Sequence, residues 1–296
     1  MELIEVDPGI YYDVPFATYC NWAAVNNSRL GWLDRSPAHY RANVGIESTK
    51  ALKLGRFIHA GQLEPATVPK LYAVMPAYER DIDNKTKSGE PSLSKGTTFY
   101  RFKRKEFMER NTDKEIIAQE HFDMLLGVLG SIANHAMAAR YLQGKAEVSI
   151  CWRDVDTGVL CKARIDAVDM QTQIGLTDLK SIESAADFSR SMEVYRYHRQ
   201  FAFYRDGWAT LTKHRVPFRV VCVEKKPPYA VRAAAIHPNA INAGREDYKS
   251  KLAIVRECLD DGCWPGYDDP EFFDLPERFY AAKPMELIVG GEVVTI

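Results

Sequence analysis

The most regular pattern in the chain is an alternation of apolar and polar residues over residues 159–168, which resumes less regularly over residues 174–181. A period of two residues is typical of a β-strand, because successive side chains of a strand point to opposite faces of its sheet. The polar residues 171–173 between the two stretches are typical of a turn. The sequence therefore predicts a β-hairpin over residues 159–181.

Helical and strand patterns follow one another along the rest of the chain. Apolar residues recur three and four positions apart, as in helices, over residues 50–63, 114–142, 184–214 (with a break near Met192) and 239–259. Short strands are predicted over residues 71–75, 147–152, 218–224 and 230–236. Helices on both sides of a group of strands indicate an α/β fold with a mixed central β-sheet of about five strands flanked by helices.

The length and composition are those of one large globular domain. The chain has 296 residues, of which 46% are hydrophobic and 27% charged. We expect a domain over residues 1–267, with a core over about residues 50–236. Within it, the polar residues 79–111 predict a surface insertion, and residues 268–296 predict an irregular acidic tail.

The sequence argues against a membrane protein, a secreted protein and a cysteine-based metal cluster. No stretch approaches the ~18 apolar residues of a membrane span, and the first fifteen residues lack the apolar run of a secretion signal. The six cysteines include no Cys-x-x-Cys pair, so structural zinc or an iron–sulfur cluster is not expected. We expect a cytoplasmic protein with reduced thiols and no membrane partner.

Charge is distributed unevenly along a chain whose formal net charge is −1. Residues 259–296 hold nine acids and two bases, a net of −7, so the remainder is +6. Residues 95–110 hold six bases and two acids, a net of +4, interleaved with four aromatic residues. Such a mixture suits the backbone and bases of a nucleic acid, although a solvated surface insertion is the alternative. The bases Lys103, Arg104 and Lys105 are therefore predicted DNA contacts.

The predicted hairpin brings acidic residues together. If its turn is symmetric about Thr172, Asp166 faces Asp178, while Asp178 and Lys180 share a face because they are two apart. Two facing carboxylates are costly without a partner and form an oxygen site suited to Mg²⁺ or Mn²⁺. The alternative is a solvated hairpin face with an ordinary ion pair, which the tripeptide Asp-x-Lys alone would favour.

Other residues are candidates for the same site. Glu147 on the preceding strand could add a third carboxylate, and His59 a nitrogen ligand. Gln200 and Tyr204 are four apart on a predicted helix, so they share a face, with Arg196 and Arg199 beside them as further predicted DNA contacts. Taken singly, a glutamate on a strand is more often exposed to solvent and a helical histidine more often structural, and the Gln200 and Tyr204 pair alone carries almost no information.

Taken together, the residues resemble the PD-(D/E)xK nuclease superfamily, and within it the exonuclease VIII (RecE-type) nuclease domain of phages and prophages. The resemblance extends from about Gly9 to Tyr267. Its motifs are GIYYDVP at 9–15, SPAHY at 36–40, Gly55-x-x-x-His59, Leu63-Glu64-Pro65, Glu147, CKARID ending at Asp166, Asp178-Leu179-Lys180, Gln200-x-x-x-Tyr204, and WPGY at 264–267. The Pro-Asp of the superfamily signature is here Ile165-Asp166, a departure that removes no ligand.

The resemblance implies a role for each matching position. Asp166, Asp178, the Leu179 carbonyl, His59 and Glu147 would hold the metal, Mg²⁺ or alternatively Mn²⁺. Lys180 would orient or activate the attacking water, and the accessory pair Gln200 and Tyr204 would support the site and the DNA end.

The resemblance also implies an activity. It implies 5′→3′ degradation of linear double-stranded DNA, leaving a 3′ single strand for an annealing protein, by a ring-shaped homo-oligomer. Two alternatives remain open: a nuclease of the AddB or CRISPR-adaptation type without its iron–sulfur cluster, and a DNA-binding module with an inactive site.

Overall fold

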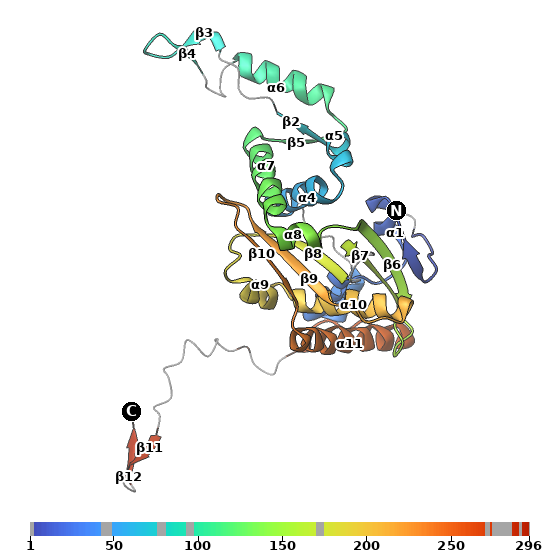
Figure 1. Ribbon diagram of the computed structural model, residues 1–296. Coiled ribbons are helices and arrows are strands. Elements are labelled where there is room, and N and C mark those ends of the chain that lie inside the picture. Colours follow the sequence, from blue (N-terminus) through green and yellow to red (C-terminus); the bar gives the residue numbers. More distant parts are fainter. Residues whose placement is uncertain are drawn as a thin grey trace.

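A six-stranded sheet in the order β1-β6-β7-β8-β9-β10 forms the centre of the fold (Figure 1). The computed structural model describes residues 3–42, 49–75, 81–92, 98–169, 175–269, 273, 286–289 and 292–295. The strands of the sheet are β1 (Gly9–Tyr11), β6 (Lys145–Arg153), β7 (Leu160–Asp169), β8 (Gly175–Ile182), β9 (Phe218–Glu224) and β10 (Val231–Ala235). All neighbours are antiparallel except β8 and β9, so the sheet is mixed, as predicted.

The predicted strands lie within two residues of the observed ones at nearly every end, but the composition of the sheet differs in two respects. The strand predicted at residues 71–75 exists as β2 (Tyr72–Val74), but it pairs in parallel with β5 (Glu115–Ile117) outside the central sheet. The sixth strand of the sheet is β1, which the sequence did not predict because three residues are too few for a period to show.

The register predicted for the hairpin is confirmed. Ala167 pairs with Thr177, Val168 with Leu176, and Asp169 with Gly175, so each pair is symmetric about position 172. The turn that was predicted at residues 171–173 lies outside the described residues.

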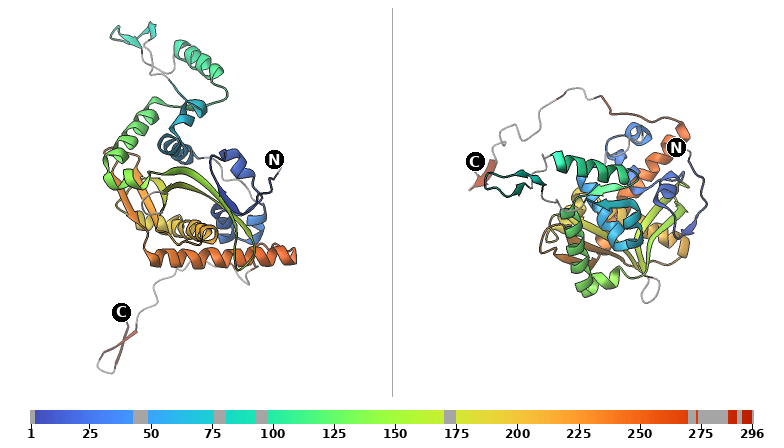
Figure 2. Two further views of the ribbon diagram at one scale, coloured as in Figure 1. Left: turned by 45° about the vertical axis from the view of Figure 1, so that its right-hand side comes forward. Right: turned by 90° about the horizontal axis from the view of Figure 1, so that it is seen from above.

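Helices cover both faces of the sheet (Figure 2). On one face lie α10 (Tyr197–Thr212) and α11 (Pro238–Asp261), whose apolar residues join those of the sheet in a large core that includes Ile165, Phe201 and Leu252. On the other face lie α4 (Lys50–Leu63), α7 (Gln119–Asn134) and α8 (Ala136–Tyr141). Their core includes Phe57, Leu125 and Leu179.

The helix bounds follow from local sequence signals. The predicted helix over residues 50–63 matches α4, because the Thr49 side chain accepts a hydrogen bond from the Leu52 amide and so caps the first turn. α11 has Pro238 in its first turn and ends at Gly262, which adopts a left-handed φ of 67°.

Two of the predicted helices are interrupted. Residues 114–142 contain strand β5 before α7 and α8, since the backbone of residues 115–117 pairs with β2 from a distant part of the chain. Residues 184–214 form α9 (Phe188–Val194) and α10, with the break at Tyr195 and Arg196 and not at Met192.

The remaining elements lie at the N-terminal side, in the insertion and in the tail. They are α1 (Phe16–Asn21), α2 (Asn27–Leu30), a 3₁₀ turn at Gly31–Asp34, α3 (Pro37–Ala42), a second 3₁₀ turn at Pro65–Thr67, α5 (Val68–Leu71), β3 (Asp81–Lys85), β4 (Pro91–Ser92) and α6 (Thr98–Arg110). The tail was predicted to be irregular, but part of it forms the antiparallel pair β11 (Glu286–Val289) and β12 (Glu292–Thr295). Among the described helices, none is both long and apolar enough to cross a bilayer.

Candidate active site

The candidate site lies where β7 and β8 separate. Their main-chain pairing is recorded from Asp169 only as far as Ala167 and Thr177. One residue further along β7, the Asp166 side chain accepts the Leu179 N–H at 2.7 Å. A carboxylate thus bonds a main-chain donor of the neighbouring strand, which fixes the Asp166 side chain at the opening between the two strands.

Three potential metal ligands converge on this opening. One ligand atom each of His59, Glu147 and Asp166 lies within 4.8 Å of the other two. His59, from α4, places Nδ1 3.6 Å from Asp166 Oδ2. The structure therefore brings together residues from a helix and two strands that are up to 107 positions apart.

Glu147 has an unusual backbone conformation. Its φ is +54°, in the left-handed region that non-glycine residues seldom adopt. The β6–β7 register contains Ala146↔Ala167 and Val148↔Ile165 but no pair at Glu147. Strained residues of this kind are concentrated at functional sites, and here the irregularity lies beside Asp166.

Asp178, Lys180 and Gln200 form a second group next to the first. Gln200 Nε2 donates to Asp178 Oδ1 at 2.7 Å, and Lys180 Nζ donates to Gln200 Oε1 at 3.2 Å. Lys180 Nζ also lies 2.7 Å from Asp178 Oδ2, as an ion pair. The amide of Gln200 thereby holds both charged groups, and Tyr204 lies one turn further along α10, where burial raises the pKa of its hydroxyl well above its usual range.

Arg164 is a residue of this site that sequence reasoning did not single out. Its guanidinium makes a short hydrogen bond from Nε to Glu147 and a 2.6 Å hydrogen bond to the Val14 carbonyl, and it lies 3.5 Å from Glu64. The signal was present, because residues 164 and 166 are two apart on one strand and therefore share a face.

Crowding of these acids changes their protonation. Burial, reinforced by the charge of Asp166, raises the pKa of Glu147 to about 7, although the Arg164 guanidinium acts in the opposite direction. Burial and the charge of Asp178 also raise the pKa of Asp166 well above its usual range. Without a cation, the site therefore retains protons near neutral pH.

The pKa values of the two basic groups of the site, His59 and Lys180, are shifted in opposite directions. Burial and the charge of Lys180 lower the pKa of His59, which favours the neutral imidazole that a metal requires. Burial also lowers the pKa of Lys180, but the charges of Asp178 and Asp166 outweigh it and the pKa is raised overall. Lys180 is consequently an ammonium group in this setting.

The donor set fits a divalent cation. One imidazole and several carboxylates suit Mn²⁺ or Mg²⁺, and burial together with the repulsion between neighbouring carboxylates raises the pKa values of Glu147 and Asp166. Asp178 Oδ2 is buried and has its ion pair with Lys180 but no hydrogen bond of good geometry. It is therefore available as a further oxygen ligand.

The two arginines of α10 that were predicted to contact DNA differ in their surroundings. Arg196 is exposed at the start of α10. Arg199 is only 5% exposed; it bonds Asn27 Oδ1 at 3.1 Å and Asp34 Oδ2 at 3.2 Å and lies 3.6 Å from Asp247. Arg199 joins α2, α10 and α11, so its guanidinium is already held by protein groups, and a contact with DNA stays a prediction.

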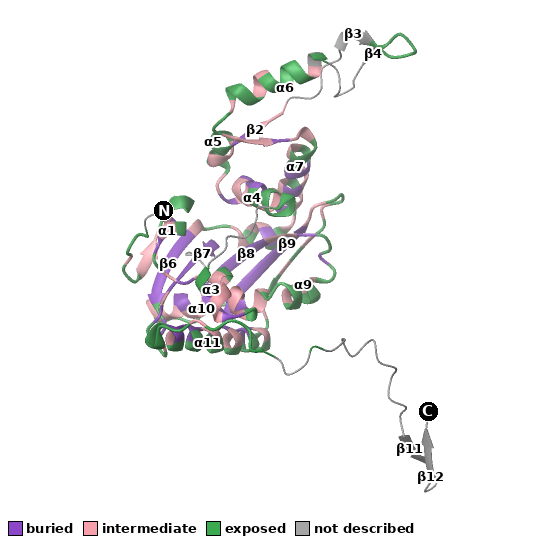
Figure 3. Ribbon diagram, turned by 180° about the vertical axis from the view of Figure 1, so that it is seen from behind, coloured by how far each residue is buried: buried purple, intermediate pink, exposed green. Residues whose placement is uncertain are grey.

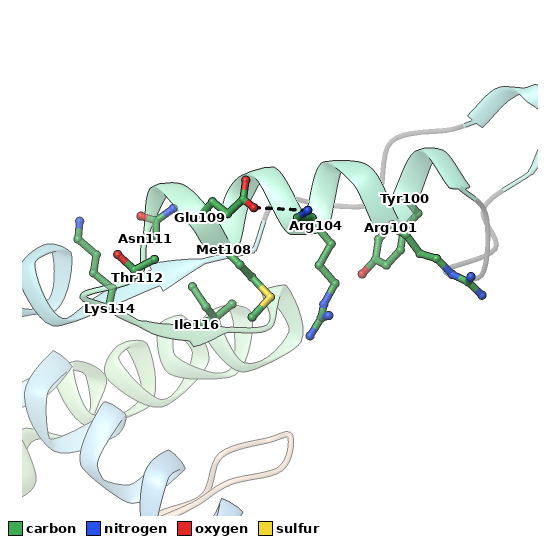
Figure 4. A pocket seen from close by; sticks show the side chains of 10 residues that line it. Tyr100, Arg101, Arg104, Met108, Glu109, Asn111, Thr112, Lys114 and Ile116 are labelled. Atoms are coloured by element: carbon green, nitrogen blue, oxygen red, sulfur yellow. Dashed lines mark ion pairs between the residues drawn. The ribbon is translucent and has the colours of Figure 1, made fainter.

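The three predicted contacts of the insertion lie on α6. Lys103 and Lys105 form ion pairs along the helix with Glu106 at 3.9 Å and Glu109 at 3.7 Å. Arg104 extends from α6 into an open groove of about 820 Å³ between this helix and the segment leading into β5 (Figure 4). The groove is separate from the acidic site, and its lining includes Tyr100, Arg101, Arg104, Lys105, Met108 and Lys114.

The chain is similar in fold to a solved structure. A crystal structure described as a "putative exonuclease" from Eubacterium rectale has a TM-score of 0.56 and 13% identity, and the match covers 92% of this chain and 99% of that one. A structure described as SSO0001 has a TM-score of 0.29 and 11% identity, and the match covers 67% of this chain and 85% of that one. None of the curated proteins compared with the chain matches it.

The first of these structures shows a shared fold at an identity too low to show more. A family model described as "PDDEXK-like domain of unknown function (DUF3799)" matches residues 27–274, a span that contains all the acidic residues of the candidate site. The resemblance to the PD-(D/E)xK superfamily is thus confirmed, and the chain belongs to this family of PDDEXK-like nuclease domains.

Proposed function

We propose that the chain is a metal-dependent exodeoxyribonuclease that degrades linear double-stranded DNA from 5′ to 3′ and leaves 3′ single strands. The observation that carries the proposal is the convergence of His59, Glu147 and Asp166 beside the Asp178–Lys180 pair. Carboxylates, an imidazole and an ammonium in one place suit phosphodiester hydrolysis, in which a metal and a cation offset charge on the phosphate.

Each residue has a distinct part in the proposed reaction. His59, Glu147, Asp166, Asp178 and the Leu179 carbonyl would hold Mg²⁺ or Mn²⁺. A cation held there would lower the pKa of the attacking water and offset charge on the departing 3′ oxygen. The water oxygen would bond to phosphorus as the bond from phosphorus to the 3′ oxygen breaks. The proton of the water would pass to solvent and the departing 3′ oxygen would take one up, so that a nucleotide with a 3′ hydroxyl leaves and the shortened strand keeps a 5′ phosphate.

Protein groups around the metal position would orient the reactants. Lys180 would donate to the attacking water or to a phosphate oxygen, since its ammonium is held at the site by Asp178 and Gln200. Gln200 donates to the carboxylate and accepts from the ammonium, so it fixes the position of one relative to the other. Arg164 holds Glu147 and limits the repulsion between Glu147 and Asp166.

The part of the DNA duplex that follows the strand end held in the site would lie against the basic surface of α6 and near Arg196. Arg101, Arg104 and Lys105 line the groove of α6, where phosphates would find positive charge and Tyr100 would offer a ring to a base. We further propose a ring of several copies around the DNA and a single-strand annealing protein that receives the 3′ tail. Light scattering of the purified protein tests the ring.

Digestion of end-labelled linear duplex with Mg²⁺ tests the activity, with nicked circles and single strands as comparison substrates. A 5′ label should be released at once and a 3′ label late, whereas nicked circles should resist. Release of the 3′ label first would contradict the proposed 5′→3′ polarity. Absence of digestion with Mg²⁺ and also with Mn²⁺ would overturn the proposed function.

A matched pair of variants tests the site. Asp178→Asn should abolish digestion; it keeps an oxygen acceptor for Gln200 but loses the ion pair with Lys180, so its melting temperature is measured beside its activity to show that it is folded. Asp156→Asn is the control, because Asp156 is exposed on the β6–β7 turn and pairs only with Lys249 among the described ion pairs. Retained digestion by Asp178→Asn would show that this carboxylate is not part of the machinery.

A further inference from the structure

An exposed apolar ledge lies at the junction of α9 and α10. Val194 is 62% exposed and Tyr195 64% exposed, and Arg196 follows with a left-handed φ of 54°. Figure 3 shows α9 as a mainly exposed helix at the surface beside the buried strands. Single exposed apolar residues are ordinary, but two neighbours at a strained junction close to a candidate active site need a reason.

Tyr195 is linked to Lys180, the proposed catalytic lysine, through the ring of Tyr197. The Tyr195 ring stacks on the Tyr197 ring, with centroids 5.5 Å apart and planes inclined by 30°. Lys180 Nζ lies 4.6 Å from the centroid of the Tyr197 ring. Tyr197 thus contacts both the exposed Tyr195 and the ammonium of Lys180, which places Tyr195 near the acidic site.

The ledge is held rigidly from below. Tyr197 also stacks on Phe188, at 6.1 Å with planes inclined by 16°, and contacts the fully buried Phe201 at 6.2 Å. The Tyr195 amide donates to the Ser191 carbonyl at 3.0 Å, which fixes the end of α9. An exposed ring on a fixed support loses little conformational freedom when a flat ligand stacks on it.

We propose that Tyr195 and Val194 form a stacking ledge for the nucleobase next to the scissile phosphate, so that this base leaves the duplex stack as its strand enters the site. The inference rests on the proposed nuclease function. A tyrosine face accepts any of the four bases, because each has a π face, and an exonuclease must accept each base in turn. The exposed Arg190 and Arg196 flank the ledge with positive charge that complements the DNA backbone.

Binding of oligonucleotides with one base removed tests the ledge without any turnover. In the Asp178→Asn background, an abasic nucleotide next to the scissile position should weaken binding by roughly 5- to 100-fold, the usual range for one stacked base. Tyr195→Ala should weaken binding of intact DNA by a similar factor and abolish the further loss caused by the abasic nucleotide. Tyr195→Phe keeps the ring, so the abasic nucleotide should weaken its DNA binding as much as it weakens binding by the protein with Tyr195.

Val155→Ala is the matched control for Val194→Ala. Val155 is 81% exposed on the turn between β6 and β7, at the far end of β7 from Asp166, so its replacement should not change binding. Val194→Ala should weaken binding several-fold. Melting temperatures of all variants confirm that each protein is folded.

Several outcomes would overturn the ledge while leaving the proposed function intact. One is wild-type digestion of DNA combined with an equal abasic penalty in the wild type and in Tyr195→Ala. Another is a change of oligomeric state in Tyr195→Ala without loss of DNA affinity, which would identify the ledge as a contact between copies of the chain. Absence of digestion and of DNA binding in the wild type would instead overturn the proposed function itself.

Discussion

Replacing Glu147 with glutamine removes a carboxyl group whose pKa the fold raises to about 7. A glutamate in an unfolded chain titrates near 4.3. Between these two values the folded, metal-free protein keeps a proton on Glu147 that the unfolded chain has released. Folding therefore takes up a proton in this window, and the free energy of unfolding must fall as the pH rises.

The size of the effect follows from the same two values. Each pH unit between the two pKa values lowers the free energy of unfolding by at most about 1.4 kcal/mol. Above about pH 7 the free energy of unfolding falls no further on account of Glu147. The ion pair with Arg164 is already included, since burial and Asp166 outweigh it. The Glu147 side chain is 15% exposed, so solvent screening removes little of the effect. From pH 5 to pH 8 the metal-free wild type should therefore lose roughly 2 to 3 kcal/mol relative to Glu147→Gln.

Urea denaturation in EDTA at several pH values measures this difference. Glu246→Gln, at an exposed position of α11, is the control and should follow the wild type at every pH. Added Mg²⁺ should stabilise the wild type more at pH 8 than at pH 6, because a cation competes with the retained proton. Parallel stability curves for the wild type and Glu147→Gln would refute the reasoning.

Three further outcomes are expected. Lys180→Ala should lower digestion at least about 100-fold while calorimetry still detects Mn²⁺ binding, because the lysine is a donor and not a ligand; loss of Mn²⁺ binding would contradict this role. Replacing Lys103, Arg104 and Lys105 with alanine should weaken DNA binding in an inactive background and lower its salt slope by up to about 2.7, at about 0.9 for each phosphate contact; an unchanged slope would identify a solvated helix face. Arg199→Leu should lower the free energy of unfolding by roughly 2 to 4 kcal/mol, with unchanged DNA affinity of the folded protein; weaker binding at full stability would speak against a structural role.

Local patterns predicted much of the fold. The hairpin register followed from a two-residue period and a symmetric turn, and the ladder from Ala167 to Asp169 has that register. Helix α4 has the predicted bounds, and local signals agree with them, because Thr49 caps its start and Glu64 precedes a proline at its end. Where the period of the side chains and the local capping signals agree, the sequence alone is sufficient to predict the bounds of an element.

Long-range contacts account for what could not be predicted. Residues 115–117 form a strand because β2, more than 40 positions earlier, pairs with them. Arg199 is a charged residue for which a solvated helix face was the alternative, but Asp34, 165 positions away, lies in contact with it and helps to bury it. The break between α9 and α10 places Tyr195 at the surface, and no signal in residues 184–214 marks that position.

The hydrogen bond from the Leu179 amide to Asp166 makes one backbone proton an intrinsic probe of the site. A hydrogen-bonded amide hydrogen exchanges with solvent only when its hydrogen bond opens. Protonation of Asp166, or engagement of its carboxylate by a cation, alters that acceptor directly, so the exchange rate of this single amide reports the state of the site. An isotope label on leucine would therefore allow occupancy to be followed in the intact protein, without substrate and without a dye.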